Sequence, residues 1–216
     1  MVISANDTTH SRWIREKKGW IKHNKQKSNI ELIECGRKAN KARVPSLVKM
    51  YNCKESFKPG IFQKTILSLE RNLDRYDYYV RTNLSTFVIT SKLEAFLLKR
   101  TRKLFYEGIY CNTDNWVNGW GIILSNDAAK VLVQEGRKRK YYIDHDIADD
   151  VLIGKILHKR GIYCRGKNLL GYSWDKKRSF EENIRVIDSN PHTIFIRLQH
   201  LDDPALVSAL YQIYSK

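Results

Sequence analysis

The sequence is poor in the residues that cross-link or interrupt a chain, with four Cys, four Pro and eleven Gly among 216 residues. So few Pro and Gly exclude a collagen-like or low-complexity chain. No two of Cys35, Cys53, Cys111 and Cys164 have the spacing of metal ligands, and the six His are scattered. Because a chain of this length buries a full core without cross-links, we expect four free thiols in a reducing compartment.

Long uncharged apolar runs are also missing. No such run approaches the length of a membrane span, and residues 1–7 lack the long apolar core of a signal peptide. We therefore expect one cytoplasmic domain over residues 1–216, with no membrane span.

Positive charge is what the sequence has in excess. The formal net charge is +16, from 39 Lys and Arg against 23 Asp and Glu. A balance this basic favours nucleic acid, an anionic membrane surface or a phosphorylated ligand as partner. Residues 12–43 hold eleven Lys or Arg against three Glu. Both a solvated helix face and a phosphate-facing patch explain that stretch.

Apolar periodicity predicts strands and helices that alternate along the whole chain. Trp13 and Trp20 recur at near-helical spacing, and we expect both in the core. The pattern predicts an α/β fold, a single domain with a mixed central sheet flanked by helices. The expected strands are 2–5, 30–35, 77–88, 117–124 and 192–199, and the expected helices are 12–23, 61–73, 91–104, 127–134 and one beginning near 204.

The stretch 77–88 is the centre of the predicted sheet. It is apolar and β-branched up to Val80 and then turns polar at Arg81, Asn83 and Ser85. Ligands of open α/β sheets bind at the carboxyl ends of the strands. These polar side chains are therefore the first candidates for a ligand site.

An acidic cluster stands out in this basic chain, because residues 144–150 contain four Asp and one His. Asp149 and Asp150 precede the apolar positions of a predicted helix. Acids at a helix start stabilise the helix dipole without any chemistry, so a structural role and a functional role both remain open on spacing alone.

Three segments together resemble the GT-A glycosyltransferases, most closely the β-1,3-galactosyltransferase and Fringe type and the related enzymes of large DNA viruses. Residues 77–88 resemble the central strand of that family, Tyr-Asp-hydrophobic-hydrophobic-Lys-Thr followed by an acidic triplet. Residues 118–125 resemble its small-residue loop near donor sugar and acceptor. Residues 149–154 are similar to the Glu-Asp-Val-x-x-Gly motif. The resemblance spans nearly the whole chain in the correct order.

The resemblance implies a hexosyl- or pentosyltransferase that moves a sugar from a nucleotide donor, a UDP-sugar, to a hydroxyl of a glycan or glycoprotein. Asp150 takes the position of the family's catalytic base, and Asp149 is the alternative. Arg15 lies in a first helix similar to the Arg-rich helix near the nucleotide. The residues expected to bind the donor are Ser4, Asn6, Arg15, Arg81, Asn83, Ser85, Asn118, Gly119, Trp120, Gly121 and Arg197.

One departure from the family concerns a divalent metal. The family's acidic triplet is replaced here by Asn83, Leu84 and Ser85. Mg²⁺ and Mn²⁺ prefer carboxylate and water oxygens, for which an amide and a hydroxyl are poor substitutes. If Asn83 and Ser85 do not hold a metal, Arg81, Asn83 and Ser85 can bind the diphosphate directly.

Two other functions remain as alternatives. A sugar-binding protein that has lost catalysis would explain the missing acidic triplet. A nucleic-acid-binding protein would explain the charge, five Trp and twelve Tyr, although residues 144–150 would repel a phosphate backbone and no common nucleic-acid-binding motif is present. We expect no nucleic acid partner.

Overall fold

The computed structural model describes residues 1–4, 13–14, 17, 19–22, 24, 29–36, 48–111, 116–165, 170–198 and 205–214. The chain divides into two compact units, each with its own sheet. The first unit comprises Met1–Asn6, Glu31–Asn83 and Thr101–Lys167, and the second comprises Asp7–Ile30, Leu84–Arg100 and Asn168–Lys216. That residues 1–216 behave as one domain stays a prediction.

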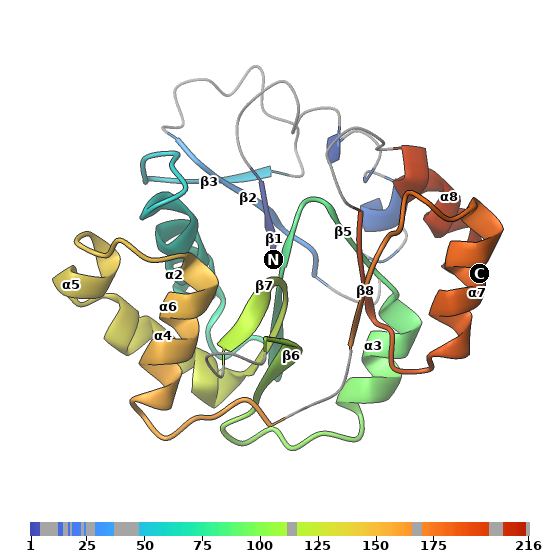
Figure 1. The fold of residues 1–216 in the computed structure, drawn as a ribbon. Helices are drawn as coiled ribbons and strands as arrows, with labels where there is room; N and C mark the ends of the chain where they lie inside the picture. Colours follow the sequence, from blue (N-terminus) through green and yellow to red (C-terminus); the bar gives the residue numbers. More distant parts are fainter. Residues whose placement is uncertain are drawn as a thin grey trace. The chain divides into compact units, whose positions relative to one another are not determined.

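The first unit is built on a six-stranded mixed sheet (Figure 1). Its strand order is β3-β2-β1-β4-β7-β6. Strands β3, β2, β1 and β4 are parallel, and β7 runs antiparallel to both β4 and β6. The predicted α/β fold with a mixed central sheet flanked by helices is confirmed. The strands are β1 (Val2–Ile3), β2 (Leu32–Cys35), β3 (Val48–Tyr51), β4 (Tyr78–Asn83), β6 (Tyr106–Cys111) and β7 (Trp116–Ser125).

A layer of helices packs against this sheet (Figure 1). Helix α2 contacts α4, and α4 contacts α6. Their apolar faces and the side chains of β4, β6 and β7 form one buried cluster, which includes Phe62, Tyr79, Ile122, Leu132 and Ile156. The helices are α2 (Gly60–Asn72), α4 (Asn126–Gly136), the short α5 (Arg139–Tyr142) and α6 (Asp149–His158).

The second unit has a three-stranded sheet of order β5-β9-β8. Residues Trp13 and Trp20 are helical and buried here, so the prediction that both are core residues is confirmed. Its strands are β5 (Thr86–Val88), β8 (Gly171–Ser173) and β9 (Phe195–Arg197), and its helices are α3 (Thr90–Leu97), α7 (Phe180–Ser189) and α8 (Ala205–Tyr214).

The predicted helix over 91–104 is too long, because α3 ends at Leu97. Beyond it the chain tightens, since the N–H of Lys99 donates to the Phe96 carbonyl at 3.2 Å and the N–H of Arg100 to the Leu97 carbonyl at 3.0 Å. These bonds reach back three residues rather than four, which is how α-helices commonly terminate. Leu104 then has a φ of 46°, outside the helical region.

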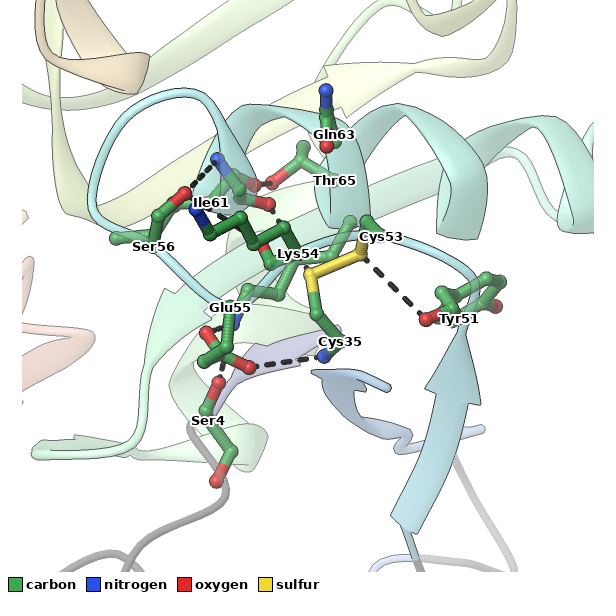
Figure 2. The surroundings of a disulfide bond; sticks show 12 residues. Ser4, Cys35, Tyr51, Cys53, Lys54, Glu55, Ser56, Ile61, Gln63 and Thr65 are labelled. Carbon is green, nitrogen blue, oxygen red and sulfur yellow. Dashed lines mark hydrogen bonds and ion pairs between the residues drawn. A yellow bond between two sulfur atoms is a disulfide. The ribbon is translucent and has the colours of Figure 1, made fainter. Parts of the chain in front are cut away.

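The prediction of free thiols is wrong for Cys35 and Cys53, which form a disulfide (Figure 2). Cys35 ends β2, and the parallel pairing of β2 with β3 places Tyr51 beside it. Cys53 follows two residues later, and the two Cα atoms lie 4.9 Å apart. Cys164 is not disulfide-bonded. Disulfides persist in oxidising compartments, so the argument for a reducing compartment loses this support.

No helix in the described ranges is long and apolar enough to cross a membrane.

Candidate functional site

The carboxyl end of β4 carries the candidate site. This strand lies between β1, which is parallel to it, and β7, which is antiparallel. Side chains alternate along a strand, so Tyr79, Arg81 and Asn83 share one face. Tyr79 belongs to the cluster formed with the helices, and Arg81 and Asn83 therefore face the helical layer as well.

Arg81 forms a buried ion pair with Asp149, the first residue of α6. Arg81 Nη2 lies 2.5 Å from Asp149 Oδ2, and the two side chains are 2% and 8% exposed. Burial raises the pKa of Asp149, while the Arg81 guanidinium opposes this rise. A buried charge without its partner is strongly destabilising, so this pair anchors the start of α6 to the central strand.

Gly119 of β7 lies directly beside this pair. Its N–H donates a hydrogen bond of 2.9 Å to Asp150 Oδ2. A Cβ atom at this position would lie 2.5 Å from Arg81 Nη1 and 3.1 Å from Asp150 Oδ2. Any other residue here would require the guanidinium of Arg81 to shift. That Gly119 binds the donor stays a prediction.

Gly154 explains why α6 can bring its two acids to this place. A Cβ atom there would lie 2.6 Å from Trp116 Cβ and 3.1 Å from Trp116 Cα. The helix therefore packs directly on the backbone of β7 through Gly154, one turn after its acidic start. The spacing from Asp150 to Gly154 is thus a packing requirement as well as a motif.

The two acids of α6 have different surroundings. Asp149 is buried against Arg81, whereas Asp150 is partly exposed. Asp150 accepts one backbone N–H on each oxygen, from Gly119 at 2.9 Å and from Val151 at 2.9 Å. Both acids lie in the first turn, and Ala148 is the N-cap residue, so both also stabilise the helix start. The structural explanation therefore holds for both acids.

The ion pair with Asp149 does not use all the donor groups of Arg81. Its Nε and Nη1 atoms are buried and have no hydrogen-bond partner among the residues that the structure describes. A guanidinium carries five N–H donors, and buried donors are rarely left unpaired in folded proteins. An oxyanion that reached this point would satisfy them. The site therefore holds two N–H-bearing atoms of Arg81 for which the described residues supply no acceptor.

Ser4 lies at the carboxyl end of β1 in a separate polar network. Its hydroxyl donates to Glu34 Oε1 at 2.9 Å, and its carbonyl accepts from Lys64 Nζ at 2.6 Å. Lys64 also pairs with Glu55. The other oxygen of Glu55 accepts the N–H of Cys35 at 3.0 Å (Figure 2). The sequence argument missed Glu34, Lys64 and Glu55. The sequence signal for this polar network is Lys64. It lies in the predicted helix over 61–73, one turn before Ser68, on the inward side of that helix.

The position of the missing acidic triplet does not suit a divalent cation. Asn83 is half-buried beside Ile3 of β1 and shares its face with the buried Arg81. A neutral amide next to a guanidinium offers a cation neither ligands of the preferred type nor a favourable field. Within the described ranges no group of three or more His, Cys, Asp or Glu side chains is arranged to hold a metal ion.

The remaining predicted residues of β7 surround Gly119. Asn118 Oδ1 accepts the N–H of Trp120 at 3.4 Å, and Trp120 is buried. The carbonyl of Gly121 packs against Gly108, where a Cβ atom would lie only 1.9 Å from it. This close contact accompanies the irregular pairing of β6 and β7 next to Gly108. The three residues therefore shape the part of strand β7 around the Asp150 contact, where a small-residue loop was predicted.

Four further residues were predicted to bind the donor. Asn6 and Arg15 lie outside the described residues. Ser85 and Arg197 belong to the second unit, where the Ser85 carbonyl accepts the N–H of Leu198 at 2.9 Å and Arg197 ends β9 with its side chain exposed. Their role in donor binding stays a prediction.

Solved structures that match this chain include two of the galactosyltransferase LgtC. Its complex with donor and acceptor sugar analogues matches at a TM-score of 0.49 and 9% identity, over 99% of this chain and 94% of that chain. An active-site mutant of LgtC matches at a TM-score of 0.48 and 8% identity, over 100% and 96% of the two chains. No family model and no curated protein matches the sequence. A likeness this distant supports no argument about activity. The argument for an activity therefore rests on the residues at the carboxyl end of β4.

Proposed function

We propose that the protein is a glycosyltransferase that moves a sugar from a nucleotide donor to a hydroxyl group of a glycan acceptor. The observation that carries the proposal is the convergence of Arg81, Gly119 and Asp150 from three segments distant in sequence. These are the segments whose residues resemble the GT-A enzymes. Their meeting at the carboxyl end of a central strand fits the usual place of ligands in α/β sheets.

Asp150 acts as the general base in this proposal. It removes the proton of the acceptor hydroxyl as that oxygen attacks the anomeric carbon, and the bond from that carbon to the donor phosphate breaks. The N–H groups of Gly119 and Val151 fix the Asp150 carboxylate by one hydrogen bond to each oxygen. Each of these bonds occupies only one lone pair of the oxygen that accepts it. Partial exposure leaves Asp150 open to an acceptor, whereas Asp149 is buried against Arg81. Asp149 is therefore a positioning residue.

Arg81 and Asn83 bind the donor diphosphate. Arg81 offers two N–H-bearing atoms without partners among the described residues, and Asn83 follows on the same face of the strand. A fixed cation stabilises the charge that develops on the leaving nucleotide. We assign no step to a metal ion. The donor that the resemblance favours is a UDP-sugar.

The decisive experiment compares Asp150→Asn with Asp146→Asn. Nucleotide release and sugar transfer are measured with a panel of UDP-sugars and simple glycan acceptors, and donor binding is measured by calorimetry. Loss of a general base lowers the rate by roughly 10²–10⁴-fold. We expect this loss for Asp150→Asn with donor binding retained. Asp146→Asn is the control, because the Asp146 side chain is 99% exposed and bonded only to Lys58 in the described structure. Full transfer activity in folded Asp150→Asn would refute the assignment.

Calorimetric titration with UDP, GDP and CMP, each with and without Mn²⁺, tests the ligand class separately. Selective binding of UDP without metal would support direct recognition by Arg81. Gly119→Ala should weaken that binding, because its Cβ atom would displace the guanidinium. If no nucleotide binds in any condition, the transferase proposal fails.

A nucleotide-sugar-binding protein without catalysis is the second candidate. It is favoured by the absence of acids at residues 83–85 and by the two backbone hydrogen bonds that already hold Asp150. Tight UDP-sugar binding with neither hydrolysis nor transfer would select this candidate.

A further inference from the structure

Lys64 of helix α2 is a buried cation to which the proposed transfer assigns no role. Its side chain is 1% exposed. The Nζ atom donates to the Ser4 carbonyl at 2.6 Å and forms an ion pair with Glu55. Taking an ammonium group out of water is unfavourable, and apolar side chains of similar size fill a core equally well. The position of Lys64 therefore indicates a role besides packing.

Glu55 lies beside the disulfide and connects it to this cation (Figure 2). One Glu55 oxygen pairs with Lys64, and the other accepts the N–H of Cys35 at 3.0 Å. Cys35 is bonded to Cys53, which precedes Glu55 by two residues. The disulfide thus ties the chain that carries Glu55 to the end of β2. Through Glu55, Lys64 joins the end of β2 to Ser4, which directly follows β1.

This network lies within the first unit, at the edge of the sheet that carries the proposed donor site. Ile3 of β1 is paired with Ile33 of β2 on one side and with Asn83 of β4 on the other. Ser4 is the next residue, so it lies at the same sheet edge as Asn83. Neighbouring strands are about 4.8 Å apart, so the end of β2 lies roughly 10 Å from the end of β4. A nucleotide whose diphosphate is bound by Arg81 and Asn83 therefore has its nucleoside within reach of the ends of β1 and β2.

We propose that Lys64 is a positioning residue for donor binding, and that it makes the affinity for the donor depend on the Cys35–Cys53 disulfide. The inference rests on the proposed transferase function and names a regulation of the same site. With the disulfide formed, Glu55 stays beside Lys64. Lys64 then holds the ends of β1 and β2 in the arrangement that receives the nucleotide.

Reduction of the disulfide removes this support. Cys53 is partly exposed, whereas Cys35 is 2% exposed, so an external thiolate attacks the sulfur of Cys53. Cys35 leaves as a thiolate, and the second thiol of a dithiol reductant then releases Cys53. The reductant is oxidised to a disulfide, and the protein gains two thiols. Glu55 is no longer tied to β2 through Cys53, and its contact with Lys64 weakens.

Calorimetric titration with UDP, of the oxidised chain and of the chain in dithiothreitol, tests the proposal. We expect reduction to raise the Kd for UDP by roughly tenfold, the effect of losing one or two hydrogen bonds. Lys64→Met should raise the Kd of the oxidised chain by a similar factor. Dithiothreitol should then change that Kd by less than about twofold, because both changes break the same link. The transfer rate at saturating donor should fall by less than about threefold, since the interaction serves binding.

Glu55→Gln is a second variant, on a side chain that is 33% exposed. Glutamine keeps an oxygen for the N–H of Cys35 but lacks the charge that pairs with Lys64. It should therefore raise the Kd for UDP and reduce the response to dithiothreitol, as Lys64→Met does. If reduction or Lys64→Met unfolds the chain, oxidised Glu55→Gln decides, and an unchanged Kd overturns the proposal.

Lys130→Met and Cys164→Ser are the matched controls. Lys130 also pairs with an acid, Asp74, at 2.6 Å, but both side chains are exposed, and Cys164 is not disulfide-bonded. Both variants should keep the Kd of the original chain and its response to dithiothreitol. An equal response in Lys64→Met and the original chain would overturn the proposal, as would UDP binding that ignores dithiothreitol, and the transferase proposal would stand in either case. If the original chain binds no UDP, the proposed function fails and this inference fails with it.

Discussion

The buried cations Arg81 and Lys17, one in each unit, have different kinds of partner. In the first unit Arg81 and Asp149 neutralise each other. In the second unit Lys17 is fully buried, and its Nζ donates to the Thr86 carbonyl at 2.6 Å and lies 5.5 Å from the Trp20 ring. Burial lowers the pKa of Lys17 to about 7. A carbonyl and a ring face compensate part of the lost hydration of an ammonium group, but they are not a counter-ion.

Lys17 therefore makes stability depend on pH. In the unfolded chain its pKa is 10.5, so between pH 7 and that value the unfolded state binds the extra proton. The free energy of unfolding should rise with pH in this window, by up to about 1.4 kcal/mol per pH unit from this group. Conversely, this contribution to stability is lost as the pH falls from 10.5 to about 7, and below that pH both states are protonated and no further loss follows. Lys17→Met should abolish that rise, which urea unfolding at about pH 7 and about pH 9 would measure.

The control for this prediction is Lys22→Met, on an exposed residue of the same helical stretch. It should keep the rise of the original chain. If Lys17→Met and the original chain show the same slope against pH, Lys17 is not neutral in the folded state.

The candidate site residues show which parts of the site could be predicted from the sequence. Asp149, Asp150, Gly119 and Arg81 were all predicted, because a polar strand end, a glycine loop and an acidic helix start each leave a local pattern. Their separate environments were not predictable, since the ion pair from Arg81 to Asp149 joins residues 68 positions apart. A pairing over such a distance depends on the sheet order and leaves no trace in spacing.

Helix α6 is the element that connects packing with the site. Its closeness to β7 depends on Gly154, where a Cβ atom would lie 3.1 Å from the backbone of Trp116. Gly154→Ala should push the helix outward, cost about 1–3 kcal/mol of stability and carry Asp150 away from Gly119. A displacement of this kind can lower a catalysed rate by roughly 10²-fold. Thermal unfolding and transfer kinetics on the same sample measure both effects.

Gly161→Ala distinguishes lost stability from lost geometry. Gly161 has a φ of 73°, and a Cβ atom there would meet nothing within 4 Å. The substitution should cost about 1 kcal/mol through the backbone alone and leave the transfer rate unchanged. If both alanine variants lose activity in proportion to stability, the position of α6 is not what matters.

Long periodic elements were predicted better than short ones. Helices α2, α4 and α8 and strand β7 have clear apolar patterns, and the structure contains each. Strand β5 was merged with β4 into one predicted strand over 77–88, although the two belong to different sheets. Strand β8 has three residues and β6 has a register shift, so neither offers enough alternation to be recognised. The end of α3 was missed because cations continue at helical spacing beyond Leu97.

At the scale of the whole molecule, the division into two units was invisible in the sequence. The chain leaves and re-enters each unit without a linker rich in Pro, Gly or Ser, for example between Asn83 and Leu84 within the stretch 77–88. Domain boundaries that cut through a continuous apolar pattern carry no compositional signal. Only contacts between distant segments reveal them.

The disulfide was missed for a related reason, and it has a consequence for the stability of the whole chain. Cys35 and Cys53 are 18 residues apart in the sequence and are brought together by the pairing of β2 and β3. Cross-linking a loop of that length restricts the unfolded chain and stabilises the folded one by about 3 kcal/mol.

Dithiothreitol should therefore lower the free energy of unfolding of the original chain by about that amount. Cys35→Ser/Cys53→Ser should show the same loss and no further response to dithiothreitol. Urea unfolding of both proteins, with and without reductant, measures this, and Cys164→Ser is the control that should keep the response. Identical unfolding of the original chain in both conditions would mean that the two thiols are not joined in solution, and the expectation of a reducing compartment would regain its basis.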